Sequence, residues 1–292
     1  MFHLFSALNA KLYHWYQFTI SCFGEFGFQV KEARELSKLA INVINLLPKS
    51  DKYPLVADFL DDFILHLMGI YFTTISHHDA IQSLTLSGHG LNCMMILRSQ
   101  LEAVLIFLFI TEPDLDLKQV KLRIENYLDW IKVKMKQNME RSSKLIFYIE
   151  KCNDDFKASV IRNYEAVLEK YVNNQQEFNR ILRSSSFLKD KRSIAEINGI
   201  ENLYEHIYSE SSAAIHVADI SDRMREDENF PFNIYSYIIR HNRGALWPLM
   251  LSNLLEVYAI RRLAKFFSID SIVEPLLIKI FMKKEIKRDK AR

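Results

Sequence analysis

Glycine and proline are rare in this sequence: 7 Gly and 6 Pro occur among 292 residues. Tight turns depend on these two residue types, because glycine accepts positive φ and proline fixes φ at the first turn position. A chain with so few of them must spend most of its length in long elements. Apolar residues recur at helical spacing, and no segment flanked by turn residues shows the alternation of apolar and polar residues that is typical of a strand. The sequence therefore predicts an all-α fold, an irregular multi-helix bundle with one long antiparallel helical pair at about residues 117–182.

Charge and cysteine usage exclude several classes of protein. The 38 basic and 36 acidic residues are interspersed, so the chain lacks the basic face that is typical of a nucleic-acid-binding module. Its three cysteines are widely spaced and odd in number, which suits a reducing cytosol and argues against a disulfide framework or a zinc motif. The N-terminus lacks the basic leader, clean apolar run and cleavage site of a signal peptide. We therefore expect a cytoplasmic protein.

Two apolar stretches need to be weighed as membrane spans. Leu101–Ile110 is strongly apolar but shorter than the roughly 20 residues that cross a bilayer. Gly244–Ile260 is longer, yet it contains Pro248, Asn253 and Glu256. Both are expected to be buried core helices, and no stable insertion into a membrane is predicted.

Arg98 and Glu102 are the strongest local anomaly in the sequence. They stand four residues apart in a segment, 94–108, whose other residues are mostly apolar. A helix that is apolar nearly all round is buried, so both charges are predicted to be desolvated. A buried charge is costly without a partner and roughly breaks even with one. Because Arg before Glu is also the weaker order for such a pair, a functional site and an internal salt bridge are both open interpretations.

A second polar face lies in the segment 202–224. Tyr204, Tyr208, Ser212 and His216 recur every four residues, which keeps them on one face of a helix. A lone histidine on such a face is more often a packed core residue than a catalyst. Here a hydroxyl one turn earlier and a phenol two turns earlier strengthen the alternative, a role for His216 in proton transfer, and both interpretations stay open.

These two patterns together resemble a known family. The motif R-x-x-x-E in an apolar helix (Arg98, Glu102) is followed much later by Y-x-x-x-S-x-x-x-H (Tyr208, Ser212, His216). This pairing is similar to the domain of unknown function 5677 family, whose members are helical prokaryotic proteins without an established activity.

The resemblance also implies a polar-aromatic helix at RIENYLDW. It carries Arg123 and Tyr127 over as candidate substrate-binding residues, with Asp129 beside them. Prokaryotic helical families of this kind are associated with phage defence or stress responses. No residue of this sequence supports that association independently.

We expect the chain to form a single helical domain, 1–292. The core that resembles the family covers about residues 55–265. The N-terminal helices in 1–50 lie outside it, as do the C-terminal helix and basic tail in 268–292.

Standard catalytic and metal motifs do not occur in the sequence. It has no G-x-x-x-x-G-K, G-x-G-x-x-G, H-E-x-x-H or G-x-S-x-G, which argues against common nucleotide, zinc-protease and lipase-type sites. His66 and His77 would be about 16 Å apart along a helix, too far to share a metal ion, so neither a metal nor a cofactor is expected. A helical ribonuclease of the HEPN type has His soon after Arg, and no Arg here has that spacing. A split site with Arg98 and His216 from different helices could perform similar chemistry.

Two hypotheses about function follow. In the first, the chain is a hydrolase or nuclease acting on an anionic substrate such as RNA. His216 would be the general acid/base and Arg98 would bind the anion. Glu102 would orient one of them, and Tyr208 or Ser212 would donate a hydrogen bond. In the second, the chain is a non-enzymatic binding or scaffolding module, the polar cluster is structural, and function lies on the long helical pair or at a homodimer interface.

Overall fold

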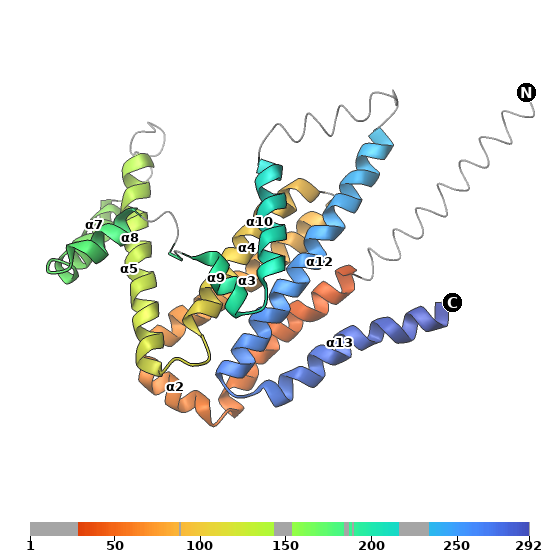
Figure 1. The fold of residues 1–292 in the computed structure, drawn as a ribbon, viewed down its shortest axis with the longest axis horizontal. Coiled ribbons are helices and arrows are strands. Elements are labelled where there is room, and N and C mark those ends of the chain that lie inside the picture. The colour runs from red at the N-terminus through yellow and green to blue at the C-terminus, as the bar shows by residue number, and fades with distance from the viewer. Residues whose placement is uncertain are drawn as a thin grey trace, which may run out of the picture.

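The computed structural model describes residues 29–87, 89–142, 154–183, 187–188, 190–215 and 234–291. Every regular element in these ranges is a helix (Figure 1). They are helix 29–46, the 3₁₀-helix η1 (Leu47–Lys49), α2 (Lys52–Leu60), α3 (Phe63–Leu86), α4 (Gly90–Ile110), α5 (Leu117–Ser142), α7 (Asp154–Lys170), α8 (Gln175–Arg183), α9 (Lys191–Ile197), α10 (Glu201–Ile215), α12 (Ile234–Phe266) and α13 (Asp270–Ala291). The prediction of an all-α, multi-helix fold is confirmed.

Helix α4 is the centre of the bundle. It packs against α3 and α12 along its length and against α9 and α10 on another side (Figure 1). By length and composition alone, its stretch Asn92–Ile110, with a mean hydropathy of 1.9, is the one span among the described residues that could cross a membrane. In the fold, 61% of that stretch is buried, and Leu101, Val104 and Leu105 are fully enclosed. Most of the apolar surface of α4 therefore packs against other helices of the chain.

Helix α3 and helix 29–46 also contribute buried side chains to the main core. The buried residues of α3 recur at spacings of three and four, as expected for a helix with one face on a core; they are Leu67, Ile70, Tyr71, Thr74, Ile75, His78, Ile81, Gln82 and Thr85. Tyr71 donates a hydrogen bond to the carbonyl oxygen of Ala40 at 3.2 Å. This contact ties helix 29–46 to the middle of α3.

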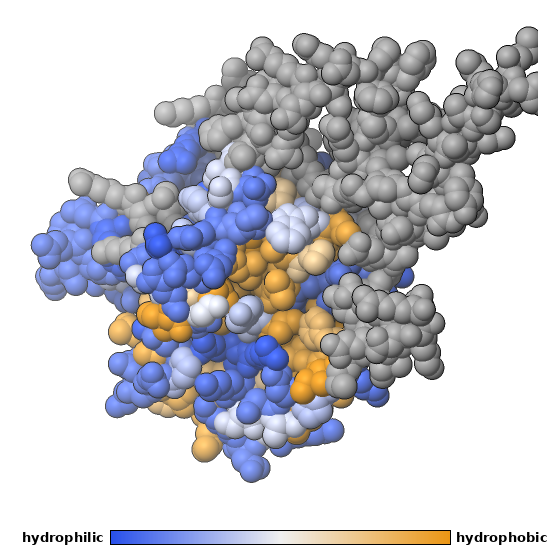
Figure 2. All heavy atoms as spheres, turned by 45° about the vertical axis from the view of Figure 1, so that its right-hand side comes forward, coloured by the Kyte–Doolittle hydropathy of each residue, from blue (hydrophilic) through white to orange (hydrophobic). Residues whose placement is uncertain are grey.

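Helices α5, α7 and α8 form an arm with a small apolar cluster of its own (Figure 1). The buried residues of this cluster are Val133, Val167, Tyr171, Phe178 and Ile181. Trp130 packs against this cluster and against the main core, so it joins the two. Figure 2 shows that the α7 side of the molecule is largely hydrophilic, whereas apolar side chains gather over the middle of the same face.

The predicted antiparallel pair corresponds to α5 and α7. Lys170 at the end of α7 pairs with Asp129 on α5 at 2.7 Å. The ammonium group of Lys136, two turns further along α5, lies 4.8 Å from the ring centroid of Tyr164, which is earlier in α7. Positions therefore rise along α5 as they fall along α7. The second helix of the pair ends at Lys170 and the chain resumes as α8, so it is not continuous to residue 182.

Candidate functional site

Arg98 on α4 contacts Tyr208 on α10, 110 residues later in the chain. Its Nη2 donates a hydrogen bond to the Tyr208 hydroxyl oxygen at 3.0 Å, and its Cζ lies 4.4 Å from the centroid of the Tyr208 ring. The ring of Tyr204, one turn earlier, lies 5.6 Å from that of Tyr208. The two polar patterns of the sequence therefore meet in the fold.

Glu102, one turn after Arg98, lies between two cations. Its Oε1 is 4.0 Å from Arg98 Nε but 2.6 Å from Lys191 Nζ. The shorter contact is a charge-assisted hydrogen bond, whereas the longer one is a purely Coulombic interaction. Glu102 therefore pairs mainly with Lys191, and it compensates the positive charge of Arg98 only weakly. We refer to Arg98, Glu102, Lys191 and Tyr208 as the α4–α10 site.

Lys191 was not identified from the sequence. It is the first residue of α9, whose start is fixed by Asp190 as N-cap. The Asp190 carboxylate accepts hydrogen bonds from the Ser193 backbone N–H at 2.9 Å and from the Ser193 hydroxyl at 2.6 Å. Asp is among the preferred N-cap residues, so the sequence could have located the start of α9, but not the contact between Lys191 and Glu102.

The prediction that Arg98 and Glu102 are desolvated is wrong. Their side chains are 28% and 37% exposed. Both lie on the stripe of α4 that α9 and α10 cover, and these short helices leave the charged ends in contact with water. An overall apolar helix does not reveal which of its stripes is at the edge of the bundle. A ligand can therefore reach these charges.

Two further candidates follow Tyr208 in the sequence: Ser212, predicted to bind substrate, and His216, predicted to be catalytic. Ser212 is half-buried, one turn later. Its neighbour Ser211 is fully buried and donates a hydrogen bond to the carbonyl oxygen of Tyr208 at 3.2 Å. His216 lies outside the described residues, so its predicted convergence with Arg98 stays a prediction.

Arg123 and Tyr127 occupy a different place, where α5 crosses the end of α4. Arg123 pairs with Glu112 at 2.8 Å, and its guanidinium carbon lies 3.9 Å from the centroid of the Phe109 ring. The ring of Tyr127 packs edge-on against Phe187 at 5.3 Å, and burial raises the pKa of its hydroxyl. Phe109 and Arg98 are about 16 Å apart along α4. The structure therefore does not bring these two residues to the α4–α10 site.

A polar network that the sequence analysis missed lies in the core between α3, α4 and α12. Ser252 donates a hydrogen bond to Gln100 Oε1 at 2.7 Å, and His78 Nδ1 lies 2.7 Å from the Ser252 oxygen. All three side chains are fully buried. We refer to these three residues and Glu256 as the core network.

His78 is neutral in this position. Burial lowers the pKa of its ring to about 4, although the Ala33 carbonyl and the Asp79 carboxylate oppose the shift. The Ala33 carbonyl oxygen lies 3.3 Å from Nε2. The core network therefore contains an uncharged histidine whose two ring nitrogens face the Ser252 hydroxyl and the Ala33 carbonyl.

Glu256, one turn after Ser252 on α12, is the other titratable member of the network. It is fully buried, and burial raises the pKa of its carboxyl group to about 8. Thr74 and Gln100 oppose the rise, but neither they nor any other described residue reaches hydrogen-bond geometry with its oxygens. The carboxyl group is therefore mostly protonated at neutral pH. From the sequence, Glu256 was interpreted only as a charged residue that makes Gly244–Ile260 unsuitable as a membrane span.

Within the described ranges, no group of three or more His, Cys, Asp or Glu side chains is placed to hold a metal ion.

Comparison with known proteins places the chain in a family. A family model described as a family of unknown function (DUF5677) matches residues 65–231. The match spans more than half of the chain, which belongs to this family. The resemblance predicted from the motifs is thus confirmed, over a shorter range than the 55–265 expected. No curated protein and no solved structure matches the chain.

Proposed function

We propose that this member of the DUF5677 family binds a phosphate-bearing substrate at the α4–α10 site and hydrolyses it, the substrate class being RNA. The observation that carries the proposal is the contact between Arg98 and Tyr208. It joins the R-x-x-x-E pattern to the helix face on which the sequence continues to Ser212 and His216. One site can therefore combine an anion-binding cation with groups that transfer protons.

The charge balance of the site favours an anionic ligand. Among the described residues, two cations, Arg98 and Lys191, pair with one carboxylate, that of Glu102, which is bound to Lys191 at 2.6 Å. The Arg98 side chain is 28% exposed, so its guanidinium is accessible from solvent. A planar guanidinium donates paired hydrogen bonds to phosphate oxygens, which makes arginine the preferred residue for this task.

The other residues supply the chemistry in this proposal. His216 acts as general acid or base, since an imidazole titrates close to neutral pH. Ser212 donates a hydrogen bond to the substrate, and Tyr208 holds the Arg98 guanidinium in position. An RNA-cleaving activity of this kind would suit a cytoplasmic role in prokaryotic defence or stress response.

The test is an RNA-cleavage assay with the purified full-length chain and its His216→Ala variant. Loss of a general acid/base should lower the rate by about 100-fold or more, with the melting temperature unchanged. His206→Ala is the matched control, because His206 is an exposed residue of α10 that contacts Trp247. Cleavage that survives in His216→Ala, or falls equally in His206→Ala, contradicts the proposal.

A second candidate function is a non-enzymatic binding or scaffolding module. The observation in its favour is that Lys191–Glu102 and Arg98–Tyr208 tie α9 and α10 to α4. The same contacts could serve only to hold these helices in register. In that case the wild-type chain cleaves no RNA, and His216→Ala lowers the melting temperature by several degrees.

A further inference from the structure

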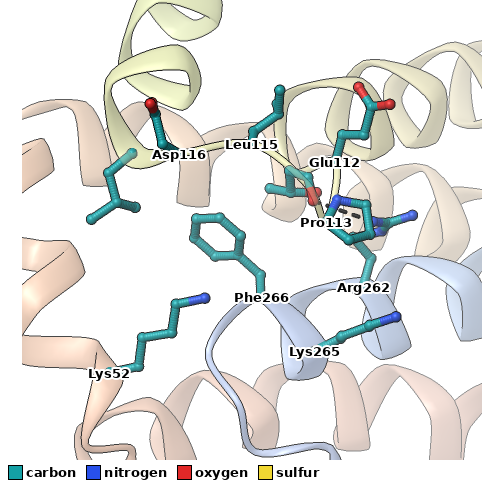
Figure 3. Close-up of a pocket in the computed structure, with 10 residues that line it drawn as sticks. Lys52, Glu112, Pro113, Leu115, Asp116, Arg262, Lys265 and Phe266 are labelled. Carbon is teal, nitrogen blue, oxygen red and sulfur yellow. Dashed lines mark hydrogen bonds between the residues drawn. The ribbon is translucent and has the colours of Figure 1, made fainter.

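A cavity of about 220 Å³ lies between the start of α2, the α4–α5 connection and the end of α12 (Figure 3). A neighbouring cavity of about 130 Å³ shares Arg262 and Lys265 with it. The larger cavity alone is below the roughly 300 Å³ at which most small-molecule sites begin, so it suits a small ligand or one part of a larger ligand. Thr111, on the cavity wall, is about 20 Å from Arg98 along α4, so the cavities are separate from the α4–α10 site.

Arg262 lines both cavities and has no carboxylate partner among the residues that the structure describes. Its guanidinium donates hydrogen bonds to the carbonyl oxygen of Thr111 at 3.2 Å and to the side-chain oxygen of Asn198 (Figure 3 shows the first). Among the described residues it makes no ion pair. Burial lowers the pKa of the guanidinium, and the more distant Glu112 only partly offsets this. A half-buried guanidinium bound only to neutral acceptors is well placed to attract an anion.

The walls of the larger cavity carry an excess of positive charge. Lys52 and Lys265 accompany Arg262, and the carboxylates are Glu112 and Asp116. Glu112 is paired with Arg123 at 2.8 Å. The Asp116 carboxylate accepts a backbone N–H in the first turn of α5. Both carboxylates are therefore engaged, whereas the three cations form no ion pair with any described residue.

Apolar groups form the rest of the wall. They are Pro113, Leu115, Leu117 and Phe266. In Figure 3 the Phe266 ring lies between Lys52 and Arg262, and the Lys52 ammonium group is 5.1 Å from the ring centroid. The cavity thus offers a flat apolar surface beside its cations, which suits a ligand with an organic part as well as an anionic one.

We infer that this cavity binds a small phosphate monoester, with its phosphate group on Arg262 and its organic part against the Phe266 ring. A phosphate monoester carries a charge of about −1.5 to −2 at neutral pH, which matches the unpaired cations. The guanidinium of Arg262 supplies hydrogen-bond donors that no described residue uses. Lys52 and Lys265 add Coulombic attraction from either side of the ring.

The test is calorimetric titration of the full-length chain with AMP, and separately with inorganic phosphate, at constant low ionic strength. Saturable binding of AMP is expected, tighter than that of inorganic phosphate. Arg262→Gln should weaken AMP binding by about tenfold or more, because charge-assisted hydrogen bonds are lost. Arg162→Gln, at an exposed position on α7, is the matched control and should bind as the wild type does.

A second variant protects the test against misfolding of Arg262→Gln. Lys265 is exposed, so Lys52→Gln/Lys265→Gln should fold normally and still bind AMP several-fold more weakly. Arg262→Gln should leave the affinity for single-stranded RNA unchanged, which separates this cavity from the α4–α10 site. The inference is overturned if the wild type shows no saturable binding at millimolar AMP, if the cavity variants bind AMP normally, or if Arg262→Gln weakens RNA binding as much as AMP binding.

Discussion

Helix α4 carries two polar regions that differ in burial and in charge. Gln100 faces α12 and belongs to the core network, whereas Arg98 and Glu102 face α9 and α10. Residues two apart on a helix point in nearly opposite directions, so neighbours in sequence enter different environments. The core network is sealed and uncharged. The α4–α10 site is partly open to solvent and retains a net positive charge.

The comparison shows how burial decides the protonation state of each group. His78 and Glu256 are fully buried, and both are held in their neutral forms at pH 7 because a low-dielectric interior penalises charge. Arg98 and Glu102, by contrast, keep about a third of each side chain exposed to water. The core network is therefore suited to fixing the packing of α3, α4 and α12, and the α4–α10 site is suited to meeting a ligand.

The largest expected effect on stability comes from His78→Ala. The substitution leaves a cavity and removes the hydrogen-bond partner of buried Ser252, so unfolding free energy should fall by about 3 kcal/mol. His66→Ala on the same helix is the matched control, because His66 is exposed, and its effect should stay within about 0.5 kcal/mol. Urea denaturation measures both. Equal losses of unfolding free energy in the two variants would show that buried His78 contributes no more to stability than exposed His66.

The next effect is a pH dependence that arises from Glu256. Its folded pKa of about 8 lies above its ordinary value of 4.5, so the unfolded chain loses this proton first. The stability contributed by the protonated carboxyl group is complete below about pH 4.5 and is lost as pH rises to about 8. His78 has the opposite sign: stability is lost as pH falls from 6.5 towards 4.

Stability measured between pH 6.5 and pH 8 therefore isolates Glu256. Wild-type unfolding free energy should fall with pH by up to about 1.4 kcal/mol per pH unit in this window. Glu256→Gln cannot ionise and should flatten the profile, whereas Glu165→Gln, at an exposed position on α7, should not. A wild-type profile that is already flat would show that the carboxyl group is ionised in the folded state.

The smallest effects on stability are expected in the α4–α10 site. Lys191→Gln and Glu102→Gln should each change unfolding free energy by less than about 1 kcal/mol, because partly exposed ion pairs are screened by water and salt. Their effects on binding of an anionic ligand should be opposite. Glu102→Gln removes a competing negative charge and strengthens binding, whereas Lys191→Gln releases Glu102 to neutralise Arg98 and weakens it. Identical changes in ligand affinity in the two variants would contradict this explanation by charge.

The sequence was sufficient to predict the helical fold, because scarce turn residues and helical spacing are local signals. The pairing of the R-x-x-x-E and Y-x-x-x-S-x-x-x-H patterns came from the resemblance to the family, and among the described residues Arg98 does contact Tyr208. Lys191 could not be assigned in this way, since its contact with Glu102 depends on how α9 folds back over α4. That is a tertiary property.

Burial was the harder quantity to predict. The apolar composition around Arg98 suggested a desolvated ion pair, but which stripe of α4 lies at the rim depends on the lengths of α9 and α10. Glu256 was visible as a carboxylate in an apolar stretch, and its burial beside Thr74 and Gln100 follows only from the packing of three helices. Local patterns thus indicate helices and faces, whereas exposure is set by the neighbours that each face acquires.

The most direct test of the central claim is the affinity of a short single-stranded RNA for the wild type and for Arg98→Gln. Fluorescence anisotropy at low ionic strength, with a 2′-O-methylated RNA that resists cleavage, separates binding from turnover. The account predicts that Arg98→Gln binds about tenfold more weakly or worse, with a melting temperature close to that of the wild type. Equal affinity in the two proteins would show that Arg98 does not bind the substrate and would contradict the account.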